Sequence, residues 1–160
     1  MDEDSSRRLT LLATASLVIA VAALAVAGWT LYESRTSEPK YDATQIADAK
    51  SKACGAADIV RKGISLNTNL RPAGGPQDVT GAQAVAANAR ISLYDGGQYL
   101  LQRLDPATPA ELAEKIRQFA NNLSDIGAHA TAGVPNDDPD QSKRLSDADA
   151  ENNAITALCS

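Results

Sequence analysis

Few side chains in this sequence are of the types that catalysis requires. The chain has two cysteines, Cys54 and Cys159, and a single histidine, His129. A nucleophilic triad needs a base that a second group holds in place, and no nucleophile motif surrounds the histidine, which we interpret as an ordinary helix-end residue. A zinc site needs more histidine or cysteine ligands than these three residues supply. The sequence therefore predicts no catalytic residue, no metal, no cofactor and no enzyme.

Acidic residues are concentrated before the C-terminus. They are Asp137, Asp138, Asp140, Asp147, Asp149 and Glu151. An EF-hand calcium loop needs a glycine at its sixth position and a glutamate at its end, and this segment has neither in place. Asp138 followed by Pro139 instead indicates a helix cap and a first helical turn. We interpret the acidic residues as a solvated face.

The overall charge argues against nucleic acid as a partner. The formal net charge is −5, and no cluster of lysine and arginine is present to neutralise phosphates. The paired glycines Gly74 and Gly75 belong to neither a GxGxxG nor a GxxxxGK[ST] pattern, so they predict a turn and not a phosphate-binding loop.

The two cysteines favour a structural bond. Cys54 falls in a predicted first helix, and Cys159 is one residue from the end of the chain. If the last helix lies beside the first, a disulfide would tie the tail to the start of the domain. Closing about 100 residues contributes roughly 4 to 5 kcal/mol in the chain-entropy account, which suits a core built largely of alanine. Two free thiols are the alternative.

An apolar segment near the start predicts a membrane anchor. Residues 9–31 contain no charge, and a helix of this length, rising about 1.5 Å per residue, crosses the hydrocarbon core of a bilayer. Trp29 lies near its far end, where an aromatic ring favours the interface. A cleaved signal peptide is the alternative, because Ala25-Val26-Ala27 resembles a cleavage site.

The segment divides the chain into a short tail and an outer domain. We predict a cytoplasmic tail at 1–8, a transmembrane helix at 9–31, a juxtamembrane linker at 32–40 and an extracytoplasmic domain at 41–160. The protein would lie in the plasma membrane as a single-pass protein with its N-terminus inside and its C-terminal domain outside.

One face of the predicted anchor carries only small residues. They are Ala13, Ser16, Ala20, Ala23 and Ala27. Small residues let a second helix approach closely in lipid, so this stripe predicts a helix-packing interface. A chance stripe in an alanine-rich segment is the alternative.

The sequence of the domain beyond the membrane predicts four helices. Apolar residues recur at helical spacing over 42–64 and 79–104, then after a start at Thr108-Pro109, and again after the loop 134–142. No segment alternates as a strand would, so we expect an all-α fold in which the anchor precedes an antiparallel, four-helix, bundle-like domain.

Three local features refine these helices. We expect Gly96-Gly97 to kink or divide the second helix, and Gly127 to end the third. The Thr108-Pro109-Ala110-Glu111 run predicts a threonine cap with a glutamate three residues later. The inward residues of the third helix are expected to be Leu112, Ile116, Phe119, Leu123 and Ile126.

The whole pattern resembles small actinobacterial membrane proteins. The resemblance rests on the alanine-rich anchor, the juxtamembrane EPKYDATQIADAKSKAC, the segment ISLYDGGQYLLQRL and the late DAENNAITALC. Within that group the chain is similar to single-pass accessory subunits of mycobacterial mammalian-cell-entry (MCE) lipid importers. This resemblance implies a non-catalytic subunit of a larger lipid-transport complex, with the importer and the lipid bilayer as partners.

A function of a different class stays open. The bundle could be a free-standing envelope sensor that holds a small apolar molecule between its helices. Because the core is rich in alanine and poor in bulky side chains, we expect no large cavity there.

Overall fold

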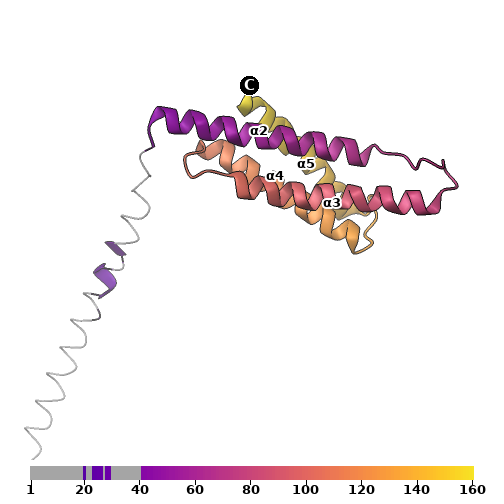
Figure 1. The fold of residues 1–160 in the computed structure, drawn as a ribbon. Helices are drawn as coiled ribbons and strands as arrows, with labels where there is room; N and C mark the ends of the chain where they lie inside the picture. Colours follow the sequence, from indigo (N-terminus) through magenta and orange to yellow (C-terminus); the bar gives the residue numbers. More distant parts are fainter. Residues whose placement is uncertain (1–19, 21–22, 27, 30–40) are drawn as a thin grey trace, which may run out of the picture. The chain divides into compact units, whose positions relative to one another are not determined.

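The computed structural model describes residues 20, 23–26, 28–29 and 41–160. The chain divides into two compact units, Met1–Lys40 and Tyr41–Ser160. The described part of the second unit has four helices and no strands (Figure 1). These are α2 (Ala43–Thr68), α3 (Val79–Arg103), α4 (Ala110–Thr131) and α5 (Pro139–Cys159). The all-α class and the helical bundle are therefore seen.

Most of the predicted anchor lies outside the described residues. The tail 1–8, the linker 32–40, and Ala13, Ser16 and Ala27 of the small-residue stripe are all outside them. The described residues within 20–29, including Ala20 and Ala23, are helical and exposed. Within the described part of the chain, no helix has both the length and the apolar character needed to cross a membrane.

Helix α2 begins at a reciprocal cap. The Asp42 carboxylate accepts a hydrogen bond from the Gln45 backbone N–H at 2.8 Å, and the Gln45 side chain accepts one from the Asp42 N–H at 3.0 Å. The predicted end near residue 64 is wrong, because the helix continues to Thr68. Side chains of Asn67 and Thr68 donate to carbonyls four residues back, which satisfies the polar groups of the last turn.

Helix α3 is continuous, so Gly96-Gly97 do not divide it as one of the two predicted effects required. These glycines instead allow close packing on both sides. A β-carbon at Gly96 would lie 2.9 Å from the Val60 side chain of α2. One at Gly97 would clash with the Ala120 carbonyl oxygen and the Ser124 hydroxyl of α4. The missing side chains therefore let α3 lie directly between α2 and α4.

Helix α4 departs from its predicted ends at both termini. Pro109 is the N-cap residue, and the Thr108 hydroxyl is buried with no hydrogen-bond partner among the described residues, so the predicted threonine cap is not formed. Gly127 does not end the helix. It brings α4 against the backbone of α3, where a β-carbon would lie 3.0 Å from the Arg90 carbonyl oxygen. The chain turns instead at Gly133, whose φ of 89° favours glycine.

Helix α5 begins as predicted. The Asp138 carboxylate accepts hydrogen bonds from the backbone N–H groups of Asp140 and Gln141, both at 3.1 Å, and Pro139 occupies the first turn. The cap interpretation of Asp138 and Pro139 is confirmed.

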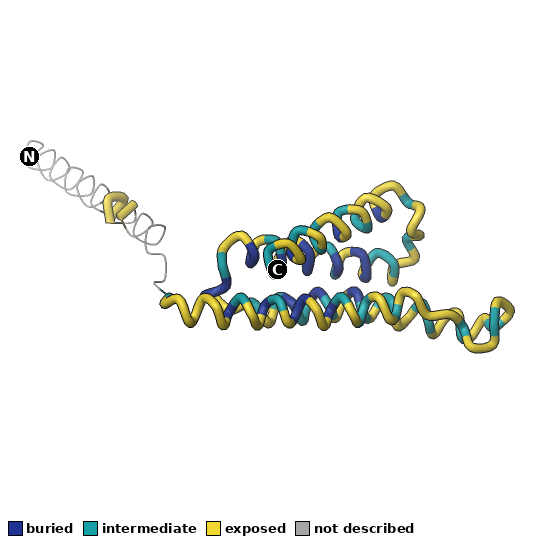
Figure 2. The backbone as a smooth tube through the Cα atoms, turned by 90° about the horizontal axis from the view of Figure 1, so that it is seen from above, coloured by how far each residue is buried: buried dark blue, intermediate teal, exposed yellow. Residues whose placement is uncertain are grey.

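The core is centred on α4. All five residues predicted to point inward from this helix are buried, and they pack with Leu93, Leu100 and Ile155 from α3 and α5. Figure 2 shows the buried residues gathered where α4 and α5 cover the α2–α3 hairpin. No residue between Val60 and Leu93 is buried. We refer to residues 61–92, the far end of this hairpin, as the distal arm.

Candidate functional site

One end of the α2–α5 pair is closed by a covalent link and a polar link. Cys54 of α2 and Cys159 of α5 form a disulfide with a Cα–Cα distance of 5.7 Å, so the predicted pairing is seen. Two turns further along α2, the Arg61 guanidinium donates to the Thr156 hydroxyl of α5 and to the Asp58 carboxylate.

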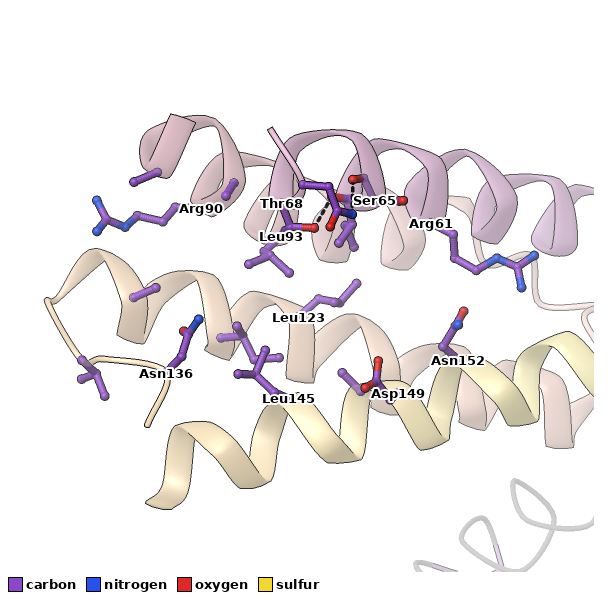
Figure 3. Close-up of a pocket in the computed structure, with 18 of the residues that line it drawn as sticks. Arg61, Ser65, Thr68, Arg90, Leu93, Leu123, Asn136, Leu145, Asp149 and Asn152 are labelled. Atoms are coloured by element: carbon purple, nitrogen blue, oxygen red, sulfur yellow. Dashed lines mark hydrogen bonds between the residues drawn. The ribbon is translucent and has the colours of Figure 1, made fainter. Parts of the chain in front are cut away.

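Beyond these links the helices border an open groove. Its volume is about 790 Å³, and its walls come from all four helices and from the turn at residues 133–136 (Figure 3). We call it the α2–α5 groove. Its large apolar lining residues are Ile64, Leu93, Phe119, Leu123, Ile126 and Leu145.

The expectation that this core would hold no large cavity is wrong. Ala86 and Ala89 of α3 and Ala148 of α5 all line the groove. A methyl group on each of these helices is too short to reach the opposite wall, so the space between the helices stays open. The alanine content that predicted a thin core is thus part of the reason for the groove.

Polar residues also line the groove. The Asn152 side-chain oxygen is buried and has no hydrogen-bond partner among the described residues. Figure 3 shows this side chain pointing from α5 toward α2, with Asp149 one turn away on the same helix. The charged residues of the lining are Arg61, Arg90 and Asp149.

We predict no catalytic role for the histidine, the cysteines or the acidic residues, and among the described residues these side chains do not cluster into a metal site. His129 is half-buried near the end of α4, and its backbone carbonyl accepts from the Val134 N–H at 3.0 Å. In the described part of the chain, no three histidine, cysteine or acidic side chains are grouped as metal ligands would be.

Among the acidic residues, Glu151 has a carboxyl group with a shifted pKa. Partial burial raises the pKa of its carboxyl above the ordinary value, and the nearby Asp147 charge acts in the same direction. The Asn122 amide, which donates to Glu151 at 3.2 Å, offsets part of this rise in pKa.

Sequence reasoning missed Asn152, although a signal was present. In the last helix, the spacing of apolar residues predicts Leu145, Ala148, Ile155 and Leu158 as the inward residues. Asn152 follows Ala148 by four residues and precedes Ile155 by three, so it falls on the same inward stripe. A polar residue on that stripe indicates either a buried hydrogen bond or a polar site.

The distal arm is a second candidate surface. It exposes large apolar side chains at its far end, with Leu66 and Val79 each 69% exposed and Leu70 48% exposed. These residues end α2, lie in the connecting loop and begin α3. All three belong to the distal arm, which joins α2 to α3.

No family model matches the sequence, and the searches of curated proteins and of solved structures gave no match either.

Proposed function

We propose that the protein is a non-catalytic accessory subunit of a larger membrane complex, of the cell-envelope lipid-transporter class. The predicted anchor at 9–31 would hold it in the plasma membrane, with the tail 1–8 inside and the helical domain outside. The class of complex rests on the resemblance to accessory subunits of MCE lipid importers.

The observation that supports an interaction role is the distal arm. Leu66, Leu70 and Val79 are exposed at its end, while no residue of the arm is buried in the domain's own core. Large apolar side chains that a domain leaves exposed are candidates for contact with another protein. The arm would insert these side chains into an apolar groove of a partner subunit.

Copurification from native membranes tests this proposal. We would tag the C-terminus of the full chain, extract it in mild detergent and identify stoichiometric partners by mass spectrometry. The variant Leu66→Gln/Val79→Gln should lose the partners, because glutamine removes the apolar contact without disturbing the core. Ile46→Gln, a change of another exposed apolar residue on α2 outside the arm, is the control and should keep them.

Either of two results would reject the proposal. A wild-type protein that copurifies with no stoichiometric membrane complex would reject the accessory role. Full recovery of the complex with the double variant would show that the arm is not the contact. Circular dichroism of both variants checks that the helices are retained.

The α2–α5 groove favours a second candidate function, a free-standing envelope sensor or small-ligand-binding domain. Its volume and apolar walls are those of sites for small molecules. Such a protein would retain its ligand after it is separated from every partner protein.

A further inference from the structure

We propose that the protein pairs with a second copy of itself through the outer side of the α2–α3 hairpin, the side away from α4. A two-fold axis would pass between the Ile59 and Tyr99 side chains of the two copies. Helix α2 would then lie antiparallel to α2 of the second copy, and α3 antiparallel to its α3. This contact goes beyond the proposed subunit role, and it uses other side chains than those exposed at the end of the distal arm.

The outer side carries two hollows with an exposed ridge between them. Helices α4 and α5 cover the opposite side of the hairpin (Figure 2), and every lining residue of both hollows belongs to α2, α3 or the loop after α3. Ile59 of α2 and Tyr99 of α3 line both hollows, so these two side chains form the ridge. Ile59 is 58% exposed, and Tyr99 is half-buried. An isoleucine next to a tyrosine supplies the apolar and aromatic centre that a protein contact needs.

The charges on either side of Tyr99 complement a copy of themselves. Asp95 and Arg103 are exposed, and each lies four residues from Tyr99, so all three share one stripe of α3. Four residues of helix rise about 6 Å. A two-fold axis at Tyr99 therefore sets Asp95 opposite Arg103 of the second copy, and Arg103 opposite its Asp95. Because a two-fold axis repeats every contact, two ion pairs would form.

Both charged side chains are available for this pairing. Neither Asp95 nor Arg103 has an ion-pair partner among the described residues. The Arg103 guanidinium lies over the Tyr99 ring, 5.0 Å from its centroid. This cation–π contact keeps the positive charge beside the ridge, where the second copy would meet it.

The matching stripe of α2 has the same symmetry. Gly55 and Gly63 each lie four residues from Ile59, so the axis sets Gly55 opposite Gly63 of the second copy. A β-carbon at either glycine would meet no packing neighbour within 4 Å among the described residues, so packing within the domain does not require a glycine there. Glycine also lowers helix propensity. The space above these two glycines would let the two α2 helices approach closely around Ile59.

Charge exchange tests the pairing. Sedimentation equilibrium of the full chain in density-matched detergent measures the dissociation constant of the dimer. Asp95→Arg would place two cations together, and Arg103→Glu would place two anions together, so each variant alone should dimerise about tenfold more weakly or worse. An equimolar mixture of the two variants should recover the wild-type affinity, because both pairs then join opposite charges.

Matched variants separate this face from the rest of the surface. Asp125→Arg makes the same charge change at an exposed residue of α4 and should leave the dissociation constant unchanged. Ile59→Gln removes the apolar centre and should weaken the dimer about tenfold. Ile46→Gln, the same change at another exposed isoleucine of α2, should not. Circular dichroism checks that every variant keeps its helices.

Three results would overturn the proposal. The first is a wild type that stays monomeric at every concentration that can be reached. The second is a dimer that Asp95→Arg and Arg103→Glu do not weaken, which would form through another face. The third is a mixture of these variants that remains as weak as each alone. None of them bears on copurification with a membrane complex, which tests the proposed function separately.

Discussion

Polar side chains join α4 to α5 at several levels. The Asn122 amide donates to the Arg144 carbonyl oxygen at 2.9 Å and to the Glu151 carboxylate at 3.2 Å. Gln141, which is completely buried, donates to the Ile126 carbonyl oxygen at 3.1 Å. Because buried polar groups are costly unless they are paired, these contacts fix the register of the two helices.

Glu151 should make the stability of the domain depend on pH. Its carboxyl has a raised pKa in the folded protein, so the folded state holds this proton more tightly than the unfolded chain does. The free energy of unfolding therefore falls as the pH rises above the ordinary glutamate pKa of 4.5, because the folded protein must then hold an ionised carboxylate. Glu151→Gln, which keeps an acceptor for Asn122, should become more stable than the wild type at pH 7.

Urea unfolding at a series of pH values measures this effect. The stability gain of Glu151→Gln should be small near pH 4 and should grow as the pH rises toward 7. A gain that is the same at every pH would contradict the proposed effect of the Glu151 charge.

Two glycines on neighbouring helices should respond in opposite directions to alanine. Gly97→Ala places a methyl group against the Ala120 carbonyl and the Ser124 hydroxyl, and this overpacking should cost about 1–3 kcal/mol of unfolding free energy. Gly55→Ala is the control. A β-carbon there meets no atom within 4 Å, so the higher helix propensity of alanine should stabilise α2 by about 0.5–1 kcal/mol. Equal effects in thermal unfolding would show that α3 and α4 are not closely packed at Gly97.

The sequence alone predicts correctly the role of residues whose role depends on their near neighbours along the chain. Asp138 caps α5 as its position before Pro139 predicts, and the inward residues of α4 follow from their spacing. It was insufficient where the role depends on another helix. A glycine that breaks a helix and one that admits a neighbour have the same local sequence, and only the position of α4 distinguishes them at Gly97.

At the scale of the helices, the α2–α3 hairpin has two halves that differ in how far their side chains are buried. Its near half, which includes Val60 and Leu93, is packed under α4 and α5. The distal arm is helical up to Thr68 and again from Val79, but it has no buried side chain (Figure 2). Isolated helices of this length have little stability of their own in water, so the arm depends on the near half for its helical order.

Hydrogen exchange should show this division. Backbone amides of α4 and of residues 93–103 of α3 should exchange only on global unfolding. Those of the distal arm should open locally and exchange about tenfold faster or more, because the arm has no fully buried side chain to expose when they open. Uniform protection along α3, measured by mass spectrometry on overlapping peptides, would contradict a separate arm. Slower exchange of the arm on adding a copurified partner would support the proposed contact.

Helix existence was predictable, whereas the space between helices was not. Periodic apolar residues identify each helix from its own sequence. The groove depends on how far α2 and α5 lie apart beyond Arg61, and on alanines that come from two different helices. No single segment contains that information.

For the whole molecule, the disulfide joins the first and last helices of the domain across 105 positions of sequence. A cross-link of this span restricts the unfolded chain strongly. The double variant Cys54→Ala/Cys159→Ala should therefore lose about 2–4 kcal/mol of unfolding free energy in denaturant titrations. Reducing agent should produce the same loss in the wild type and none in the double variant. A wild type that is unaffected by reduction would contradict the expected contribution.

The same bond determines how the domain would bear a mechanical load. Residues 54–159 form a closed covalent loop, so a pull applied between Tyr41 and the C-terminal Ser160 can extend only the segment before Cys54. The helices α3 and α4, the distal arm and the groove all lie within the loop and are shielded from that tension. In an oxidising environment, a chain tethered through its N-terminal side would thus keep the distal arm and the groove intact under force.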